Sequence, residues 1–360
     1  MGKVEIMHII EALEGGVYTY IKDITRFFSD DKDINNTVVY SANRGAMSSE
    51  LLLDELPKDV RLIEVEMRRE LEPIHDLRAT IQLKNLIKQH KPNIIHLHSS
   101  KAGALGRVAN FLSGTKAAVF YTPHGYSFLR KDTSKLTNAM FYGIEYTLKK
   151  LFRGVTIACG STEYVYAKKI GRSVVVSNWV DIATIEKYKR EPNKKISVIG
   201  TMGRITAQRN PSLFNVLAQN NPKINFLWIG DGEDRDKLTS PNITITGWMM
   251  NDEDIFKILS TIDVYVQPSS WEGLPIALLE AMALGLPALV TPIIGNKDAV
   301  IHNENGYWFK NAEEFNRLLA SLECQKIRQE MGQKGQDRCY RYFSMSTNIE
   351  QLKKIYLEDL

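Results

Sequence analysis

The sequence is poor in cysteine and contains no long apolar run. Its 360 residues include three cysteines, Cys159, Cys324 and Cys339, which are too few and too scattered for a disulfide framework or a zinc-ligand spacing. No segment approaches the roughly 20 consecutive apolar residues of a membrane-spanning helix. The opening stretch, MGKVEIMHII, holds one lysine and a short apolar run, which is typical of a first strand and not of a signal peptide. We therefore expect a protein of a reducing compartment, the cytoplasm.

Two common nucleotide-binding motifs are also missing. The segment IGDGEDRD (229–236) follows an apolar run, but Arg235 stands where a dinucleotide fingerprint needs its third glycine. The pattern G-x-x-x-x-G-K-[ST] does not occur, so the phosphate-binding loop of common ATPases is excluded. These gaps argue against an NAD-dependent enzyme and against an ATPase.

Acidic residues are missing from one long stretch of the chain. None occurs between Asp76 and Asp132, where the basic residues are Arg78, Lys84, Lys88, Lys91, Lys101, Arg107, Lys116, Arg130 and Lys131. The net charge of +4 is unevenly distributed, with +6 in residues 1–180 and −2 in residues 181–360. Such a positive field attracts phosphate groups on nucleic acid, an anionic membrane or a phosphorylated substrate. A solvated positive face without a partner is the alternative.

Short runs rich in valine and isoleucine alternate with stretches of helical period. The runs cover residues 4–10, 36–41, 93–99, 117–122, 155–160 and 174–178 in the first half, and 196–201, 224–230, 242–247, 263–268 and 288–291 in the second. Buried strands that alternate with helices predict a parallel α/β sheet. The polar stretch 181–195 separates the two series, so the sequence predicts two α/β domains.

Ligands of open parallel sheets bind beyond the carboxyl ends of the strands, so the loops there are candidate sites. In the first half, Gly15 and Gly16 precede a predicted helix whose first N–H groups can bind an anion, although a tight turn explains the same pair. His96 and His98 share one strand face, but no third ligand lies near them in sequence, so we do not predict a metal site. His124 follows the next strand, where it can bind a ligand, act as an acid or base, or fill the loop.

In the second half of the sequence, two arginines and two glutamates also lie at or near the carboxyl ends of predicted strands. Arg204 and Arg209 lie in a loop after a predicted strand, and paired guanidinium groups suit a diphosphate, with solvated surface arginines as the alternative. Glu272 follows the strand DVYVQPSS, and Glu280 lies in the next helix among apolar residues. Both carboxylates can accept hydrogen bonds from vicinal hydroxyl groups, as sugars have. The alternative is a surface Glu280 and a Glu272 that stabilises a helix start.

These residues, in this order, resemble a known family. The segment EGLPIALLE (272–280) matches the E-x7-E signature of retaining glycosyltransferases of family 4, and TPHG (122–125), GRITAQRN (203–210) and TGW (246–248) extend the resemblance over nearly the whole chain. The resemblance implies the GT-B fold, an α/β fold of two Rossmann-like doubly wound parallel-sheet domains facing a central cleft. The expected parts are an acceptor-binding domain (1–182), a linker (183–195), a nucleotide-sugar-binding domain (196–342) and a C-terminal helix that packs back on the first domain (343–360).

The resemblance also implies a role for each candidate residue. Glu280 would bind the ribose of a nucleotide-sugar, Glu272 the donor sugar, and the backbone around Trp248 and Met249 the base. The implied donor-binding set is Gly15, Gly16, Gly203, Arg204, Arg209, Gly230, Trp248, Met249, Glu272, Gly273, Leu274 and Glu280. The implied catalytic set is Arg204, Arg209, His124 and Glu272, and the implied acceptor side is His98, Lys101 and Tyr126. The family usually has lysine where Arg209 stands, which changes the geometry of that diphosphate contact.

The implied activity is transfer of a sugar, with retention of configuration, from a nucleotide-sugar to an acceptor. The forms HSSKAG and HGYSF are similar to those of enzymes that build capsular, exopolysaccharide or lipopolysaccharide repeat units. We therefore expect a UDP-sugar donor, a glycan or lipid-diphosphate-linked acceptor, no cofactor or metal, and no nucleic-acid partner. The basic first half would bring the enzyme to the inner face of the cell membrane. The alternatives are a GT-B-fold nucleotide-sugar epimerase, which needs no acceptor, and a non-catalytic subunit that supports a partner transferase.

Overall fold

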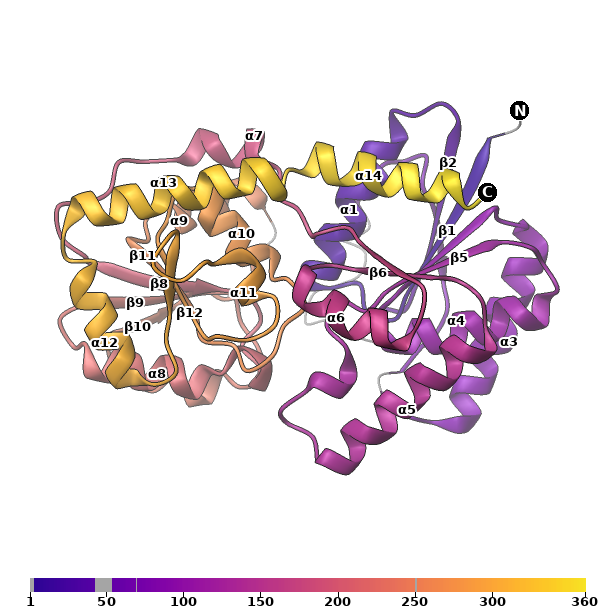
Figure 1. The fold of residues 1–360 in the computed structure, drawn as a ribbon, viewed down its shortest axis with the longest axis horizontal. Helices are drawn as coiled ribbons and strands as arrows, with labels where there is room; N and C mark the ends of the chain where they lie inside the picture. Colours follow the sequence, from indigo (N-terminus) through magenta and orange to yellow (C-terminus); the bar gives the residue numbers. More distant parts are fainter. Residues whose placement is uncertain (1–2, 43–53, 69, 250) are drawn as a thin grey trace. The chain divides into compact units, whose positions relative to one another are not determined.

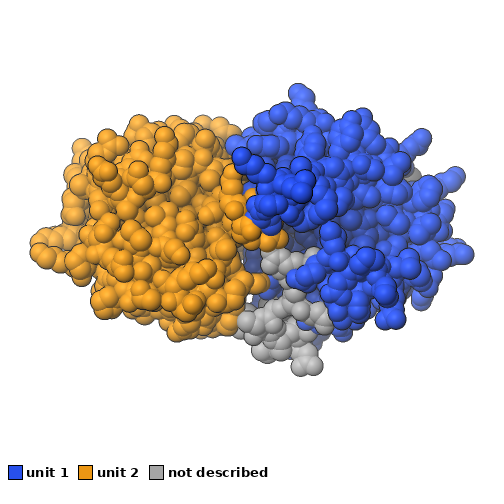
Figure 2. Space-filling model, turned by 90° about the horizontal axis from the view of Figure 1, so that it is seen from below, with its two compact units in different colours: residues 1–129, 133–176, 349–360 blue, residues 130–132, 177–348 orange. Residues whose placement is uncertain are grey.

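The chain folds into two compact units. The computed structural model describes residues 3–42, 54–68, 70–249 and 251–360 (Figure 1). Unit 1 consists of residues 1–129, 133–176 and 349–360, and unit 2 of residues 130–132 and 177–348 (Figure 2). Each unit has its own parallel sheet and its own apolar core.

The division between the units differs from the predicted one. The stretch 183–195, predicted to be a linker, belongs to unit 2. Arg190 donates to the main-chain oxygen of Thr261 (2.6 Å), and Lys189 donates to the side-chain oxygen of Gln336 (2.6 Å). Polar composition alone therefore did not identify a linker, because these side chains pack on unit 2. The chain enters unit 1 again at residue 349, later than the predicted 343.

Unit 1 is built on a parallel sheet with the strand order β3-β2-β1-β4-β5-β6-β7. Its strands are β1 (Val4–Ile10), β2 (Ile34–Tyr40), β3 (Arg61–Glu64), β4 (Ile94–His98), β5 (Ala118–Thr122), β6 (Val155–Ala158) and β7 (Ser173–Val175). Strand β3 was not predicted from the sequence, because RLIE is a short edge strand that is mostly exposed and has no apolar run.

Helices cover this sheet. They are α1 (Gly15–Ser29), α3 (Pro73–His90), α4 (Ser99–Ser113), α5 (Lys135–Leu151), α6 (Ser161–Ile170) and α14 (Met345–Glu358), with a 3-10 turn, η1 (Ser127–Leu129). The yellow helix α14 lies beside α1 (Figure 1), and the rings of Tyr356 and Phe28 are 6.2 Å apart. Within the described residues, none of the helices combines the length and the apolar composition needed to cross a bilayer.

Unit 2 has a second parallel sheet, with the order β10-β9-β8-β11-β12-β13. Its strands are β8 (Val198–Met202), β9 (Asn225–Ile229), β10 (Ile243–Ile245), β11 (Val264–Gln267), β12 (Ala288–Val290) and β13 (Gly306–Trp308). Its helices are α7 (Ile182–Ile185), α8 (Pro211–Asn220), α9 (Asp252–Leu259), α10 (Ile276–Ala283), α11 (Asn296–Ala299), α12 (Ala312–Ser321) and α13 (Gln325–Tyr342), with 3-10 turns η2 (Glu186–Tyr188), η3 (Ala207–Arg209) and η4 (Arg235–Lys237). Strand β13, a three-residue edge strand, was not predicted from the sequence. The predicted α/β class is confirmed.

The glycines of the segment HLHSSKAGALGR let α4 lie close to the sheet. A Cβ atom at Gly103 would stand 2.5 Å from the ring of Tyr121, and one at Gly106 would stand 2.3 Å from Leu97. The Tyr121 ring is fixed, because its hydroxyl donates to Glu145 (2.6 Å) and the Arg107 guanidinium lies 4.1 Å from its centre. Part of this motif therefore serves helix-on-sheet packing.

We expect Gly103→Ala to lower the free energy of unfolding by about 1–3 kcal/mol, because the added methyl group overpacks a rigid ring. The matched control is Gly143→Ala on α5, where a Cβ atom would meet nothing within 4 Å. That change should stabilise the protein by up to about 1 kcal/mol, since alanine favours helix over glycine. Calorimetric unfolding of both variants tests this pair, and a neutral Gly103→Ala would contradict the packing role.

Candidate active site

The carboxyl edge of the unit 2 sheet brings together polar residues from two loops. The loop after β8 contains Arg204, Gln208 and Arg209, and the loop after β11 contains Glu272. The main-chain N–H of Ser270 donates to the carbonyl of Gln208 (2.8 Å), which ties the two loops to each other. The position agrees with the expectation that ligands bind beyond the carboxyl ends of parallel strands.

Glu272 is a buried carboxylate surrounded by donors. Its Oε1 accepts from the hydroxyl of Ser269 (2.8 Å) and the amide of Gln267 (3.1 Å), and its Oε2 accepts from the amide of Gln208 (3.0 Å). The side chain is only 5% exposed. A carboxylate can be buried at tolerable cost when it receives several hydrogen bonds and lies beside a cation.

Arg209 provides that cation. Its Nη1 lies 3.2 Å from Oε1 of Glu272, but the pair is not aligned as a hydrogen bond, and this nitrogen is buried without an aligned acceptor among the described residues. A Cβ atom at Gly203 would lie 3.2 Å from the Arg209 guanidinium, so a side chain at position 203 would crowd this group. Gly203 also has φ +133, a conformation that favours glycine. An aligned acceptor oxygen from a ligand would satisfy the Arg209 N–H.

Arg204 lies in the same loop and has a carboxylate partner of its own. Its Nε and Nη2 donate to Glu233 at 3.2 and 3.3 Å. The Glu233 side chain is 55% exposed, so this pair lies in solvent and contributes little to stability. An incoming diphosphate can therefore replace Glu233 on the guanidinium at low cost.

Glu280 lies on α10 near the same edge. Burial raises the pKa of Tyr265 to about 12, while the charge of Arg209 lowers this pKa and the charge of Glu280 raises it. Both charged groups are therefore close enough to act on one phenol. Glu280 lies on the helix that directly follows the loop of Glu272, and Glu272 in turn lies 3.2 Å from Arg209.

The loops after β9 and β10 complete this edge. The N–H of Gly230 donates to Thr246 Oγ1 (3.0 Å), and Gly230 and Gly247 form a bridge. Trp248 follows them with 39% of its surface exposed, and Met249 is half-buried. A side chain at Gly230 would meet the carbonyl of Gly203, in the loop after β8, at 2.4 Å, so the close approach of the loops after β8 and β9 requires glycine at this position.

Gly273 and Leu274 follow Glu272 and are held by neighbouring backbone. A Cβ atom at Gly295 would overlap the carbonyl of Gly273, and the carbonyl of Leu274 accepts from Asn178 (2.6 Å). These contacts fix the loop that carries Glu272. All the predicted donor residues from Gly203 to Glu280 therefore lie in unit 2, in the loops and helix at one edge of its sheet.

The other predicted donor residues lie in unit 1. Gly15 begins α1 with φ +54, a conformation that favours glycine, and Gly16 follows in the first turn. The side chain of Glu14, the residue before α1, makes no capping hydrogen bond to this helix.

His124 lies in the loop after β5 in an uncommon backbone conformation, with φ +52. The neighbouring N–H of Gly125 donates to Glu163 Oε1 (2.8 Å), and Glu163 Oε2 accepts from the N–H of Cys159 (2.9 Å). Glu163 is fully buried. This carboxylate therefore fixes the loop that presents His124.

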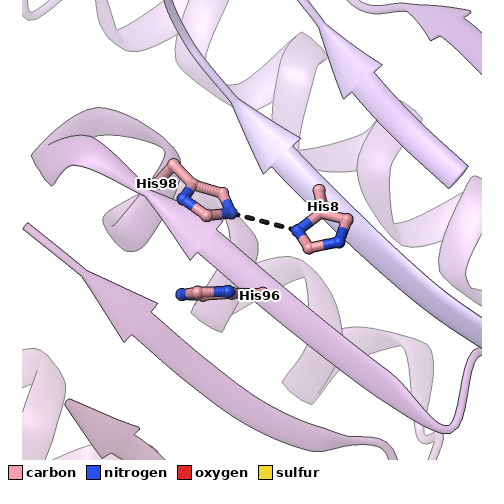
Figure 3. A group of neighbouring side chains, drawn as sticks. All are labelled: His8, His96 and His98. Atoms are coloured by element: carbon pink, nitrogen blue, oxygen red, sulfur yellow. Dashed lines mark hydrogen bonds between the residues drawn. The ribbon is translucent and has the colours of Figure 1, made fainter. Parts of the chain in front are cut away.

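A third histidine joins the pair on β4. His8 on β1 lies beside His96 and His98 (Figure 3), and ring nitrogens of the three lie within 4.8 Å of one another. His8 was not among the predicted site residues, although its position in the run VEIMHII places it on one face of a strand. Protein partners already use both nitrogens of His96, which bond to Thr122 (2.8 Å) and to Tyr356. The arrangement is that of a hydrogen-bonded group, and we do not treat it as a metal site.

Of the three residues predicted on the acceptor side, His98 and Tyr126 are buried and Lys101 is half-buried. His98 has no exposed surface, and Tyr126 is 1% exposed and stacks on Phe128 at 4.6 Å between ring centres. The Lys101 ammonium binds Asp76 (2.6 Å) and the carbonyl of Glu70 (2.7 Å). Since these side chains offer almost no surface, we do not carry them forward as acceptor contacts.

Sequence reasoning also missed Gln208, Gln267 and Ser269, the donors to Glu272. Their signal was weak, because neutral polar residues beside a strand end are common in loops. Only their convergence on one buried carboxylate gives them a role.

Two family models match the chain. The model for "Glycosyltransferase Family 4" matches residues 14–201, more than half of the chain, and the model for "Glycosyl transferases group 1" matches residues 183–338. The protein therefore belongs to glycosyltransferase family 4 and is a glycosyltransferase. This confirms the family expected from the E-x7-E segment.

Relatives in sequence and in structure agree with this. The chain is 29% identical over 344 residues to the UDP-Gal:alpha-D-GlcNAc-diphosphoundecaprenol alpha-1,3-galactosyltransferase of Escherichia coli, covering 85% of this chain and 86% of that protein. It is 22% identical to the capsular polysaccharide biosynthesis glycosyltransferase CapM of Staphylococcus aureus, covering 81% and 83%. HepE of Anabaena, solved with UDP and glucose, matches with a TM-score of 0.79 at 18% identity, covering 99% of this chain and 100% of HepE. At that identity the match shows the GT-B fold alone.

We expect Glu272→Gln to lower the free energy of unfolding by about 1–3 kcal/mol, because a neutral amide cannot pair with Arg209 or accept through both of its polar atoms. The control is Glu233→Gln, which removes the exposed carboxylate beside Arg204 and should change stability by less than about 1 kcal/mol. Calorimetry on both variants provides the measurement. Equal effects of the two substitutions would show that the Glu272 cluster does not stabilise unit 2.

Proposed function

We propose that this enzyme transfers a sugar, with retention of configuration, from a UDP-sugar to a glycan or lipid-diphosphate-linked acceptor in cell-surface polysaccharide synthesis. The observation that carries the proposal is the grouping of Arg204, Arg209, Glu272 and Glu280 at the carboxyl edge of the unit 2 sheet. Two cations suit a diphosphate, and two carboxylates suit hydroxyl groups.

Each of these groups has a distinct role in the proposal. The buried N–H of Arg209 donates to a diphosphate oxygen, and Arg204 exchanges Glu233 for another oxygen. Glu280 accepts from the ribose hydroxyls, and Glu272 from the donor sugar. Trp248, which is partly exposed, and Met249 lie beside the base. His124 of unit 1 keeps the role that the resemblance gives it, contact with the donor sugar.

The reaction follows from the charges. The bond between the anomeric carbon and the diphosphate oxygen breaks, and the acceptor oxygen bonds to that carbon on the same face. The proton of the acceptor hydroxyl passes to the departing phosphate oxygen, so atoms and charge balance. Since negative charge grows on the diphosphate as the bond breaks, the two arginines stabilise the transition state more than the bound donor. We propose that this stabilisation needs no metal ion.

The relatives support the choice of UDP and of a lipid-linked acceptor. The E. coli relative is named for transfer from UDP-galactose to a GlcNAc-diphosphoundecaprenol, and HepE was solved with UDP. These names favour transfer over the epimerase alternative. They are also consistent with the absence of acidic residues between Asp76 and Asp132, which leaves a positive field for a phosphorylated acceptor.

Donor binding and hydrolysis test the proposal directly. With EDTA present, we expect one UDP-sugar to be hydrolysed slowly, and we expect Arg204→Ala and Glu280→Ala to reduce kcat/KM for this hydrolysis by about 100-fold. Glu253→Ala, on an exposed first turn of α9, is the control and should leave the rate unchanged. Hydrolysis that requires added metal would contradict the metal-free proposal. If calorimetric titration shows no binding of any UDP-, GDP- or dTDP-sugar, the non-catalytic alternative is favoured.

We further propose that unit 1 binds an anionic membrane surface through α5. This helix buries only Glu145, and Leu136, Met140 and Leu151 lie on one helical face with exposed fractions of 82%, 45% and 67%. The last turn carries the exposed Lys150, whereas the ammonium of Lys149 donates to the carbonyl of Gly154 (2.6 Å). An exposed apolar stripe beside lysines is typical of helices that lie in a bilayer interface.

Vesicle sedimentation tests the membrane surface. We expect binding to vesicles that contain phosphatidylglycerol and weaker binding to vesicles of phosphatidylcholine alone. The double variant Leu136→Glu/Leu151→Glu should reduce binding to the anionic vesicles by about tenfold or more, since each substitution places a charge where an apolar side chain would be buried. Val216→Glu, on the exposed face of α8 in unit 2, is the control. Equal binding of the double variant and the wild type would exclude this surface.

A further inference from the structure

A row of polar side chains lies buried on one face of the unit 1 sheet. His8 on β1 pairs in register with His96 on β4, and His98 lies two residues further along the same strand. On the other side of β1, Val38 pairs with His8, so Asn36 lies on the same face two residues earlier in β2. Buried parallel strands are usually apolar on both faces, so this row needs a physical explanation.

Three of the histidines form a chain that ends at the carboxyl edge of the sheet. His8 Nδ1 lies 3.2 Å from His98 Nε2 (Figure 3), and His98 Nδ1 lies 3.1 Å from His124 Nε2. The rings of His98 and His124 are stacked with centres 5.4 Å apart, and Tyr20 packs edge-on against both. The hydrogen-bonded row of histidines therefore runs from the interior of the sheet to the loop that carries His124.

The rings of this chain are neutral at neutral pH. Burial lowers the pKa of His8 to about 4 and that of His124 to about 3, and it lowers the pKa of His98 well below the usual range. A neutral imidazole has one N–H and one lone pair. A chain of such rings has a direction, since each ring can donate only to one neighbour and accept only from the other.

The direction of the hydrogen bonds in this histidine row is set at the end that lies inside the sheet, at His8. His8 Nε2 and Asn36 Oδ1 are both buried, and neither has an aligned partner among the described residues. The Asn36 side chain nevertheless lies close enough to raise the pKa of His8 against the effect of burial. We assign the two atoms to each other, because one hydrogen bond then satisfies two buried polar groups. An amide oxygen only accepts, so His8 Nε2 carries the proton.

We propose that Asn36, His8 and His98 are positioning residues that hold His124 as its Nε2–H tautomer. His8 then accepts at Nδ1 from His98 Nε2–H, and His98 accepts at Nδ1 from His124 Nε2–H. The remaining nitrogen of His124, Nδ1, keeps its lone pair, and the residue as a whole is half-buried. This nitrogen can accept a hydrogen bond and cannot donate one.

The consequence for the reaction rests on the proposed contact of His124 with the donor sugar. A neutral ring with a lone pair at Nδ1 accepts from a sugar hydroxyl and orients it. Such a ring does not protonate the leaving group, which agrees with proton transfer to the departing phosphate. The buried polar row then has a physical explanation, because it makes Nδ1 of His124, in the loop after β5, a hydrogen-bond acceptor.

Nuclear magnetic resonance of the protein with ¹⁵N-labelled histidine tests the tautomer without any substrate. The protonated and unprotonated ring nitrogens differ widely in chemical shift, and the His124 signals are assigned by their loss in His124→Gln. We expect His124 of the wild type to be protonated at Nε2. In Asn36→Leu, which removes the terminal acceptor, a second population protonated at Nδ1 should appear. His124 protonated at Nδ1 in the wild type, or an unchanged spectrum in Asn36→Leu, would overturn the proposal.

The matched control is Asn35→Leu. Asn35 is the next residue on β2, its amide donates to Glu5 (2.7 Å), and its side chain lies on the opposite face of the sheet. We expect the His124 signals of the Asn35→Leu variant to match those of the wild type. In donor hydrolysis, Asn36→Leu should lower kcat/KM by about tenfold, as loss of outer-shell hydrogen bonds does elsewhere, and Asn35→Leu should not. If no variant turns over any donor, the proposed function fails, whereas the spectra still decide the tautomer.

Discussion

The buried carboxylate of Glu272 is the interaction on which the unit 2 site depends. A charge with 5% of its surface exposed is tolerated only because Ser269, Gln267 and Gln208 donate to it and Arg209 lies 3.2 Å away. These partners come from the loop after β8, the end of β11 and the loop after β11, so the hydrogen bonds and ion pair of one carboxylate fix two loops. The same arrangement leaves Arg209 with a buried N–H that has no aligned acceptor among the described residues. A carboxylate therefore holds the site together, and an oxygen of the proposed diphosphate would supply the acceptor that this N–H group lacks.

Unit 1 also buries polar side chains, but most of these are neutral. Its sheet buries His8, His96 and His98 on one face, where burial keeps the rings uncharged. Neutral rings cost less to bury than ions, provided that each nitrogen finds a partner. Glu163, fully buried behind the His124 loop, is satisfied by backbone N–H groups. In both units, polar groups at the ends of strands are kept in place by hydrogen bonds from neighbouring loops.

The sequence predicted the central strands of both sheets, and its errors concern edge strands, the linker and the partners of polar side chains. Apolar runs located the central strands, because strands buried on both faces need continuous valine and isoleucine. The edge strands β3 and β13 were missed, since an edge strand needs no such run. The stretch 183–195 has the composition of a linker, yet its long polar side chains bind unit 2. Lys101, which the family resemblance assigned to the acceptor side, is paired with Asp76, a contact that the sequence did not indicate.

The sequence by itself determined the α/β class, the family and the arginines and glutamates of the site, because strand periodicity and motif spacing are local properties of a chain. The tertiary structure alone decided how these residues are used. It brought Gln208 to Glu272, Glu233 to Arg204 and His8 to His98, pairs that are 64, 29 and 90 residues apart. Such pairs depend on strand order and register, which set the neighbours of each buried polar atom. The need of each buried polar atom for a partner then determines which of these neighbours form hydrogen bonds.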